Sequence, residues 1–165
     1  MRKLAIALAT LAVLAVVNVG IAHRESQVAS GTPVVLELVP VDPRALLQGD
    51  YMRLSYRIVR DAFPDRVAIP AYGDGHVVVA PDGKGVAQFV RFDDGTALKP
   101  GELRLRYRVR DGDVRFATNA WFFEEGHGAD FAGARFGEFR VAPDGEMLLV
   151  KLRDKDLGEL AHAAR

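Results

Sequence analysis

Four arginines alternate with apolar residues along positions 103–110, a spacing that suits the binding of anions. Successive side chains of a strand point to opposite faces, so one face would carry Arg104, Arg106, Arg108 and Arg110. Arg53 and Arg57 would extend this row if their strand were a neighbour. One interpretation is an anionic partner (lipid headgroups, an acidic glycan or an acidic protein surface) bound through guanidinium groups. The alternative is a solvated face paired across strands with Asp and Glu, which the balanced charge favours.

A second group of residues has side chains that could ligate a metal. Glu124, Glu125, His127 and Asp130 lie within seven residues, and carboxylates and imidazole are competent ligands. The stretch contains a single histidine, however, and acidic residues also suit the N-terminal end of a helix. We therefore predict a solvated loop and a helix start, with no metal and no cofactor.

Candidates for nucleophilic catalysis are few. The chain has no cysteine, which excludes a thiol nucleophile, a thiolate zinc site and a disulfide framework. Ser26 and Ser30 follow the apolar N-terminus, and Ser55 lies in an expected strand without a glycine-flanked elbow. A serine–lysine dyad needs a desolvated lysine, whereas the lysines fall at expected turn or surface positions. The sequence predicts a protein that is not an enzyme, with a membrane-anchored hydrolase as the weaker alternative.

The charge balance bears on the class of partner. The chain contains 22 basic and 22 acidic residues, and the remainder is slightly acidic once Arg2 and Lys3 are set aside. Nucleic-acid binding requires a basic surface. We therefore expect no nucleic-acid partner, and the identity of any small-molecule ligand stays open.

The N-terminus indicates a membrane segment. Residues 4–22 carry no charge and only Thr10 and Asn18 as polar side chains, and about 20 apolar residues in a helix span a bilayer. The basic start should stay in the cytoplasm, which places the rest outside, in the periplasm. The alternative is a cleaved signal peptide ending at 20–22. We expect an anchor at 1–22, a polar tether at 23–32 and one domain at 33–165.

The remainder alternates with the period of β-strands. The expected strands are 34–39, 51–59, 76–80, 86–92, 103–110, 114–123, 139–142 and 146–152. Asp111-Gly112 and two Pro-Asp-Gly turns indicate hairpins, and 129–136 is a helical candidate. The predicted fold is mainly β, a mostly antiparallel sandwich or barrel-like domain with one or two short helices. Its aromatic residues at 121–123, 131, 136 and 139 are expected in the core.

One segment resembles a known family signature. Residues 49–56 read Gly-Asp-Tyr-Met-Arg-Leu-Ser-Tyr and match every fixed position of the bacterial GDYXXLXY protein family. The flanking 43–47 and two later stretches, 122–126 and 134–138, are also similar. The residues that carry the resemblance are Gly49, Asp50, Tyr51, Leu54, Tyr56, Phe123, Gly126, Arg135, Gly137 and Glu138.

The resemblance implies a hydrophobic N-terminal segment followed by one outer domain. It also implies a membrane-protein partner, because members are often encoded beside multi-spanning membrane proteins. No catalytic residues are established for the family, so none are carried over. Within the motif, Gly49 and Asp50 would set a turn and Leu54 and Tyr56 would enter the core. Asp50 could pair with Arg44, and an exposed Tyr51 would mark a docking position.

Overall fold

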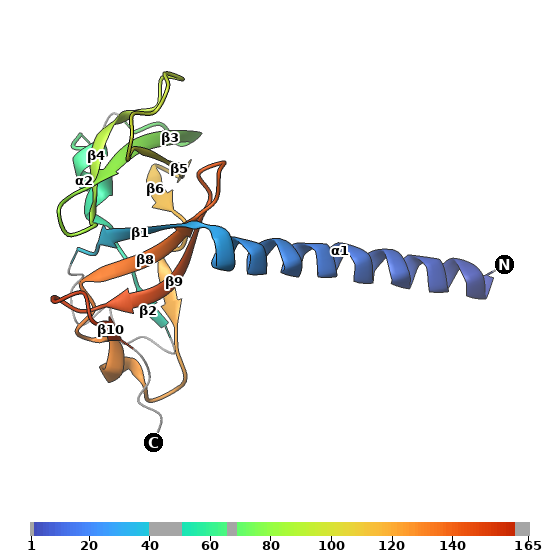
Figure 1. The fold of residues 1–165 in the computed structure, drawn as a ribbon. Coiled ribbons are helices and arrows are strands. Elements are labelled where there is room, and N and C mark those ends of the chain that lie inside the picture. The colour runs from blue at the N-terminus through green and yellow to red at the C-terminus, as the bar shows by residue number, and fades with distance from the viewer. Residues whose placement is uncertain (1, 40–50, 66–68, 161–165) are drawn as a thin grey trace.

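The computed structural model describes residues 2–39, 51–65 and 69–160. Arg44, Gly49 and Asp50, together with the turns expected around them, lie outside the described residues. The described chain forms one long helix that projects from a β-rich domain (Figure 1).

The N-terminal helix α1 runs from Arg2 to Ser30. Its residues Leu8–Ser30 are long and apolar enough to cross a membrane by length and composition, and the most apolar stretch among them is not buried against the domain. The helix extends beyond the expected anchor, because residues 23–30 of the predicted polar tether are helical as well. The amide of Gln27 provides the reason, since it bonds to backbone carbonyls of the domain near the helix end.

Two curled antiparallel sheets form the body of the domain (Figure 1). Both sheets have four strands. The one with the shorter strands, here called the smaller sheet, has the order β1-β8-β9-β10, and the larger sheet has the order β4-β3-β5-β6. Strands β2 and β7 form a separate pair. The strands are β1 Thr32–Glu37, β2 Tyr51–Arg53, β3 Tyr72–Pro81, β4 Ala87–Phe92, β5 Leu103–Arg110, β6 Asp113–Phe116, β7 Ala120–Phe122, β8 Phe136–Val141, β9 Met147–Arg153 and β10 Glu159–Leu160. The mainly β, antiparallel prediction is confirmed.

The predicted hairpins are present. Strands β3 and β4 pair antiparallel, as do β5 with β6 and β8 with β9. Asp111 and Gly112 both have positive φ values, 55° and 74°, as the mirror-image two-residue turn requires. Local turn chemistry therefore fixes these three pairings.

The expected strand at 51–59 is wrong in its second half. Strand β2 ends at Arg53, and helix α2 spans Arg57–Ala62. Ile58 and Ala62 are both buried, and this spacing of four places them on one face of a helix. The alternation of buried and exposed residues persists to Ile58, which is why the segment resembles a single strand.

The expected strand at 114–123 is divided into β6 and β7. Ala117 has a positive φ of 46° and lies where the chain leaves the larger sheet. Strand β7 then pairs with β2 rather than with β5, and the backbone N–H of Leu54 donates to the carbonyl of Asn119 at 2.8 Å. The helix expected at 129–136 is only the 3-10 turn η3, Gly128–Phe131, because Phe136 onward pairs with β1 as β8.

The core lies between the two sheets. Its fully buried large side chains include Phe116, Phe139, Leu36, Leu105 and Leu152. A row of edge-to-face aromatic contacts joins α2 to the larger sheet through Phe63, Phe92 and Tyr107. Among the side chains that the structure describes in the long helix, the apolar ones at 4–21 are exposed and lie outside this core.

Candidate functional site

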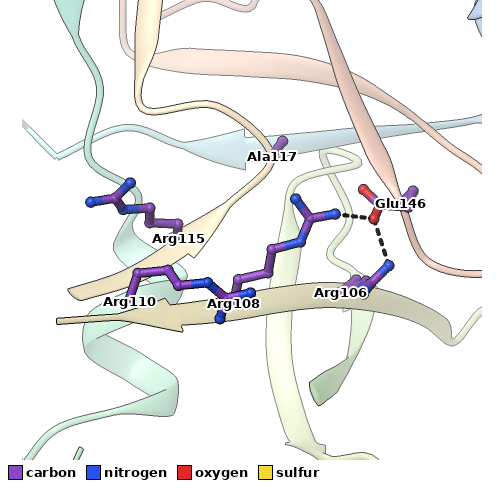
Figure 2. A pocket seen from close by; sticks show the side chains of 6 residues that line it. All are labelled: Arg106, Arg108, Arg110, Arg115, Ala117 and Glu146. Atoms are coloured by element: carbon purple, nitrogen blue, oxygen red, sulfur yellow. Dashed lines mark hydrogen bonds and ion pairs between the residues drawn. The ribbon is translucent and has the colours of Figure 1, made fainter. Parts of the chain in front are cut away.

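The arginine row forms part of a pocket between β5, β6 and the β8–β9 turn. This arginine pocket, of about 270 Å³, is lined by Arg106, Arg108, Arg110, Arg115, Ala117 and Glu146 (Figure 2). The alternation of β5 directs its arginines to one face, and the β6 register brings Arg115 opposite Arg108. The turn reaches the pocket because the N–H of Arg106 donates to the carbonyl of Gly145 at 2.9 Å.

Two arginines share one carboxylate oxygen in this pocket. Glu146 Oε1 accepts a hydrogen bond from Arg106 Nη1 at 2.7 Å and another from Arg108 Nη2. Figure 2 shows both guanidinium groups converging on Glu146, whereas Arg115 points away. Two positive charges therefore meet one negative charge, and the side chains stay partly solvent-accessible. At this bridge the pocket carries an excess of one positive charge, because Arg106 and Arg108 share the single carboxylate of Glu146.

The other arginines of the row, and Arg115 beside them, pair with carboxylates, as the solvated-face alternative describes. Arg104 bonds to Asp93 at 2.7 Å, Arg110 to Asp74 at 3.2 Å, and Arg115 to Asp113 at 3.3 Å. The proposed extension of the row is wrong, because Arg53 lies in β2, outside this sheet. Arg57 lies in α2 and pairs with Glu37 and Asp61.

The Asp93–Arg104 pair should make the free energy of unfolding depend on pH in the acidic range. The hydrogen bond from Arg104 lowers the pKa of Asp93, with a further contribution from the Gly95 N–H. A lowered pKa in the folded state stabilises the protein above the ordinary value of about 4, and this stabilisation disappears as the pH falls through the folded-state value. We expect Asp93→Asn to lower the urea midpoint at pH 7 and to lower it progressively less as the pH falls below about 4. A difference that does not change with pH would contradict this.

The acidic stretch before η3 forms a loop. Glu124 and Glu125 are exposed, and His127 Nδ1 lies 3.0 Å from Asp130 Oδ2. Within the part of the chain that the structure describes, no group of three or more His, Cys, Asp or Glu side chains is placed to hold a metal. The loop therefore gives no geometric basis for a metal site.

A second candidate surface lies on the small β2–β7 sheet. Tyr51 is directly opposite Phe122 in the register, and their ring centroids are 5.8 Å apart. Both are exposed, at 44% for Tyr51 and 74% for Phe122. The expectation that Phe122 enters the core is wrong, because neighbouring residues of a strand face opposite ways and Trp121 packs against the core instead. We call Tyr51 and Phe122 the aromatic pair.

Other motif residues are structural. Leu54 and Tyr56 are buried, and the Tyr56 hydroxyl donates to the carbonyl of Thr118. Burial raises the pKa of Tyr56 well above its ordinary value. Phe123 stacks on Phe131 with ring centroids 5.7 Å apart. Gly126 has a backbone φ of 85°, which residues other than glycine rarely adopt.

The later motif residues connect the strands of the smaller sheet. The Arg135 N–H donates to the carbonyl of Arg153, and the Arg135 carbonyl accepts from Leu38, both at 2.8 Å. Gly137 is buried beside Leu149. Glu138 is 6% exposed and accepts from Arg153 Nε at 2.8 Å. Gly137 and Glu138 therefore serve the fold as buried residues, and Arg135 does so through its backbone.

Fold and sites together define a β-rich domain carried by one long apolar helix, with the arginine pocket and the aromatic pair open to solvent. The chain belongs to the GDYXXLXY protein family, whose model matches residues 13–152, which confirms the resemblance of the motifs. No curated protein and no solved structure gives a significant match.

Proposed function

We propose that this protein is a non-enzymatic, membrane-anchored accessory domain that binds a membrane-protein partner outside the cytoplasm through the aromatic pair. The observation that carries the proposal is the exposure of Tyr51, a fixed residue of the family motif, beside the more exposed Phe122. The motif thereby has an outward-facing position as well as core positions.

Helix α1 supports the anchor. Its two polar side chains within the uncharged segment bond to the helix backbone, Thr10 to the carbonyl of Ile6 at 3.0 Å and Asn18 to that of Leu14 at 2.8 Å. Polar groups satisfied inside the helix reduce the cost of contact with lipid. The family model begins at residue 13, so the likeness includes part of the apolar segment. Arg2 and Lys3 favour an extracytoplasmic domain.

The aromatic pair supports protein binding. Aromatic side chains are enriched in protein interfaces and among the residues that dominate binding energy. The two rings form a contiguous apolar surface on a sheet whose inner face, with Met52 and Trp121, already packs on the core. A partner would therefore cover the pair without rearranging the domain. We assign this surface to an apolar segment of a membrane protein, in line with the anchor.

The non-enzymatic assignment has its own support. The arginine pocket is lined by arginine, alanine and glutamate alone, so its lining contains no serine or histidine. Ser55, the serine considered for a hydrolase, is exposed between β2 and α2. A nucleophile needs an activating base within hydrogen-bond reach, and these features provide no such arrangement.

Co-purification tests the proposal. The tagged full-length chain, solubilised from membranes in mild detergent, is expected to bring down a membrane protein. Tyr51→Ser combined with Phe122→Ser should reduce recovery at least roughly tenfold, as loss of a central interface contact does. The matched control is Tyr72→Ser, which removes another exposed aromatic, 66% accessible, from β3.

Unfolding measurements on each variant separate lost binding from lost structure. Equal recovery with the wild-type chain and the double variant would overturn the docking assignment. Recovery of the full-length chain in the soluble fraction, or with a new N-terminus after residue 22, would overturn the anchor.

A further inference from the structure

Helix α1 is attached to the domain beside the arginine pocket. Gln27 is only 5% exposed, and its Nε2 donates to the carbonyls of Arg140 at 3.1 Å and Glu146 at 3.0 Å. The side chain of the same Glu146 bridges Arg106 and Arg108. Figure 1 shows the β8–β9 turn beside the place where α1 leaves the domain. Glu146 therefore connects the helix to the pocket, because its carbonyl binds Gln27 and its carboxylate binds the two arginines.

This attachment fixes the height of the pocket above a membrane. Gln27 lies five residues beyond Ala22, the last residue of the uncharged segment, which is about 8 Å along a helix axis. The headgroup layer on each side of the hydrocarbon core is about 5–8 Å thick. Helix α1 is uninterrupted from Arg2 to Ser30. With Ala22 at the edge of the hydrocarbon core, it would place the Glu146 bridge near the outer boundary of the headgroups.

The charge of the pocket suits a phosphate. Arg108 is paired directly opposite Arg115 in the β5–β6 register, an arrangement of like charges that is unfavourable by itself. Asp113 partly offsets Arg115, but Arg106 and Arg108 have only the shared oxygen of Glu146 between them among the pocket-lining residues. Guanidinium groups donate readily to phosphate oxygens, and an additional anion would relieve this excess positive charge.

We propose that the arginine pocket binds the phosphate of anionic lipid headgroups in the leaflet where α1 ends. This inference depends on the anchoring part of the proposed function and is independent of the aromatic pair. Lipid is favoured over an acidic glycan or protein, because the Gln27 attachment holds the pocket at headgroup height. Bound headgroups would orient the domain on the membrane.

Native mass spectrometry of the full-length chain, released from neutral detergent micelles, tests the assignment. The probes are phosphatidylglycerol and phosphatidylcholine with the same acyl chains. Both lipids carry a phosphate, but the choline cation of phosphatidylcholine cancels its charge and would be repelled by the arginines. We therefore expect retention of phosphatidylglycerol roughly tenfold above phosphatidylcholine. Arg106→Gln with Arg108→Gln should abolish the difference. The control, Arg57→Gln with Arg60→Gln on α2, removes the same charge elsewhere and should leave it unchanged.

A second variant keeps every arginine and is expected to increase phosphatidylglycerol retention instead of reducing it. Glu146→Gln removes the competing carboxylate charge, so it should raise phosphatidylglycerol retention several-fold. It also remains informative if the double arginine variant does not fold. Unchanged or weaker retention by folded Glu146→Gln would contradict the proposal, as would equal retention by the wild-type chain and a folded Arg106→Gln/Arg108→Gln variant.

Glycerol 3-phosphate distinguishes a lipid site from a site for free phosphate. We expect a millimolar concentration to displace little phosphatidylglycerol, because the anchor supplies the lipid at high local concentration. Complete displacement at micromolar concentration would overturn the lipid assignment in favour of a soluble phosphate ligand. Failure of this experiment leaves co-purification through Tyr51 and Phe122 unaffected, so the two proposals fail separately.

Discussion

Tyr56→Ala is expected to lower the free energy of unfolding by about 3–5 kcal/mol, the range for truncation of a large buried aromatic side chain. Tyr56 is 2% exposed, and its ring packs edge-to-face on Phe139 with centroids 5.6 Å apart. Truncation would leave a cavity between the start of α2 and the smaller sheet, and it would leave the Thr118 carbonyl without this donor. Urea unfolding followed by circular dichroism measures the change.

Two control variants separate the contributions of this residue. Tyr56→Phe keeps the ring and removes only the hydroxyl, so it should cost about 1–2 kcal/mol. Tyr51→Ala, five residues earlier in the same motif, should stay within about 0.5 kcal/mol, as exposed substitutions do. A loss for Tyr51→Ala as large as for Tyr56→Ala would contradict the division of the motif into an outward-facing and a buried part.

Glu138→Leu is expected to cost about 3 kcal/mol, near the lower end of the range for breaking a buried ion pair. Glu138 lies inside β8, and its carboxylate accepts two hydrogen bonds from Arg153 of β9. Removing it would leave the Arg153 guanidinium, about one-quarter exposed, without its principal counter-charge. Chemical unfolding at pH 7 measures the loss.

The double variant Glu138→Leu/Arg153→Met should recover most of that loss, because replacing both partners with apolar residues of similar size is often close to neutral. The surface control is Glu159→Gln, which breaks the exposed Lys151 pair in the same smaller sheet and should cost less than about 1 kcal/mol. A double variant less stable than Glu138→Leu would contradict the assignment of the loss to an unpaired charge.

Local chemistry allowed the fold class and the three hairpins to be predicted. The period-two pattern and the Asp-Gly and Pro-Asp-Gly turns specify strands and their pairing over short distances. Residues 51–59 do not follow this pattern-based prediction, because only their first part forms a strand. Buried and exposed residues alternate through Ile58, but the burial of Ala62 on the same face makes the second half helical. A pattern shared by strand and helix over so few residues is decided by tertiary contacts.

The candidate sites were predictable to different degrees. The placement of Arg106 and Arg108 on one face follows from alternation. The motif indicates Tyr51 as a docking position if it faces solvent, and it does. The opposite direction of Phe122 also follows from alternation, since adjacent aromatics in a strand cannot both face the core. The roles of Gln27 and Glu146 could not be predicted, because they depend on long-range contacts. Gln27 bonds to Glu146, 119 residues away, and Glu146 bridges two arginines that lie 40 and 38 residues away.

Site-specific photo-crosslinking tests the central claim, that the aromatic pair is the partner-binding surface, most directly. A photoreactive phenylalanine analogue replaces Phe122 in the full-length chain in its native membrane, and Tyr72, equally aromatic and 66% exposed, is replaced in the control. The docking assignment predicts one predominant adduct with a membrane protein from position 122 and none from position 72. No adduct from position 122, or the same adducts from both positions, would contradict it.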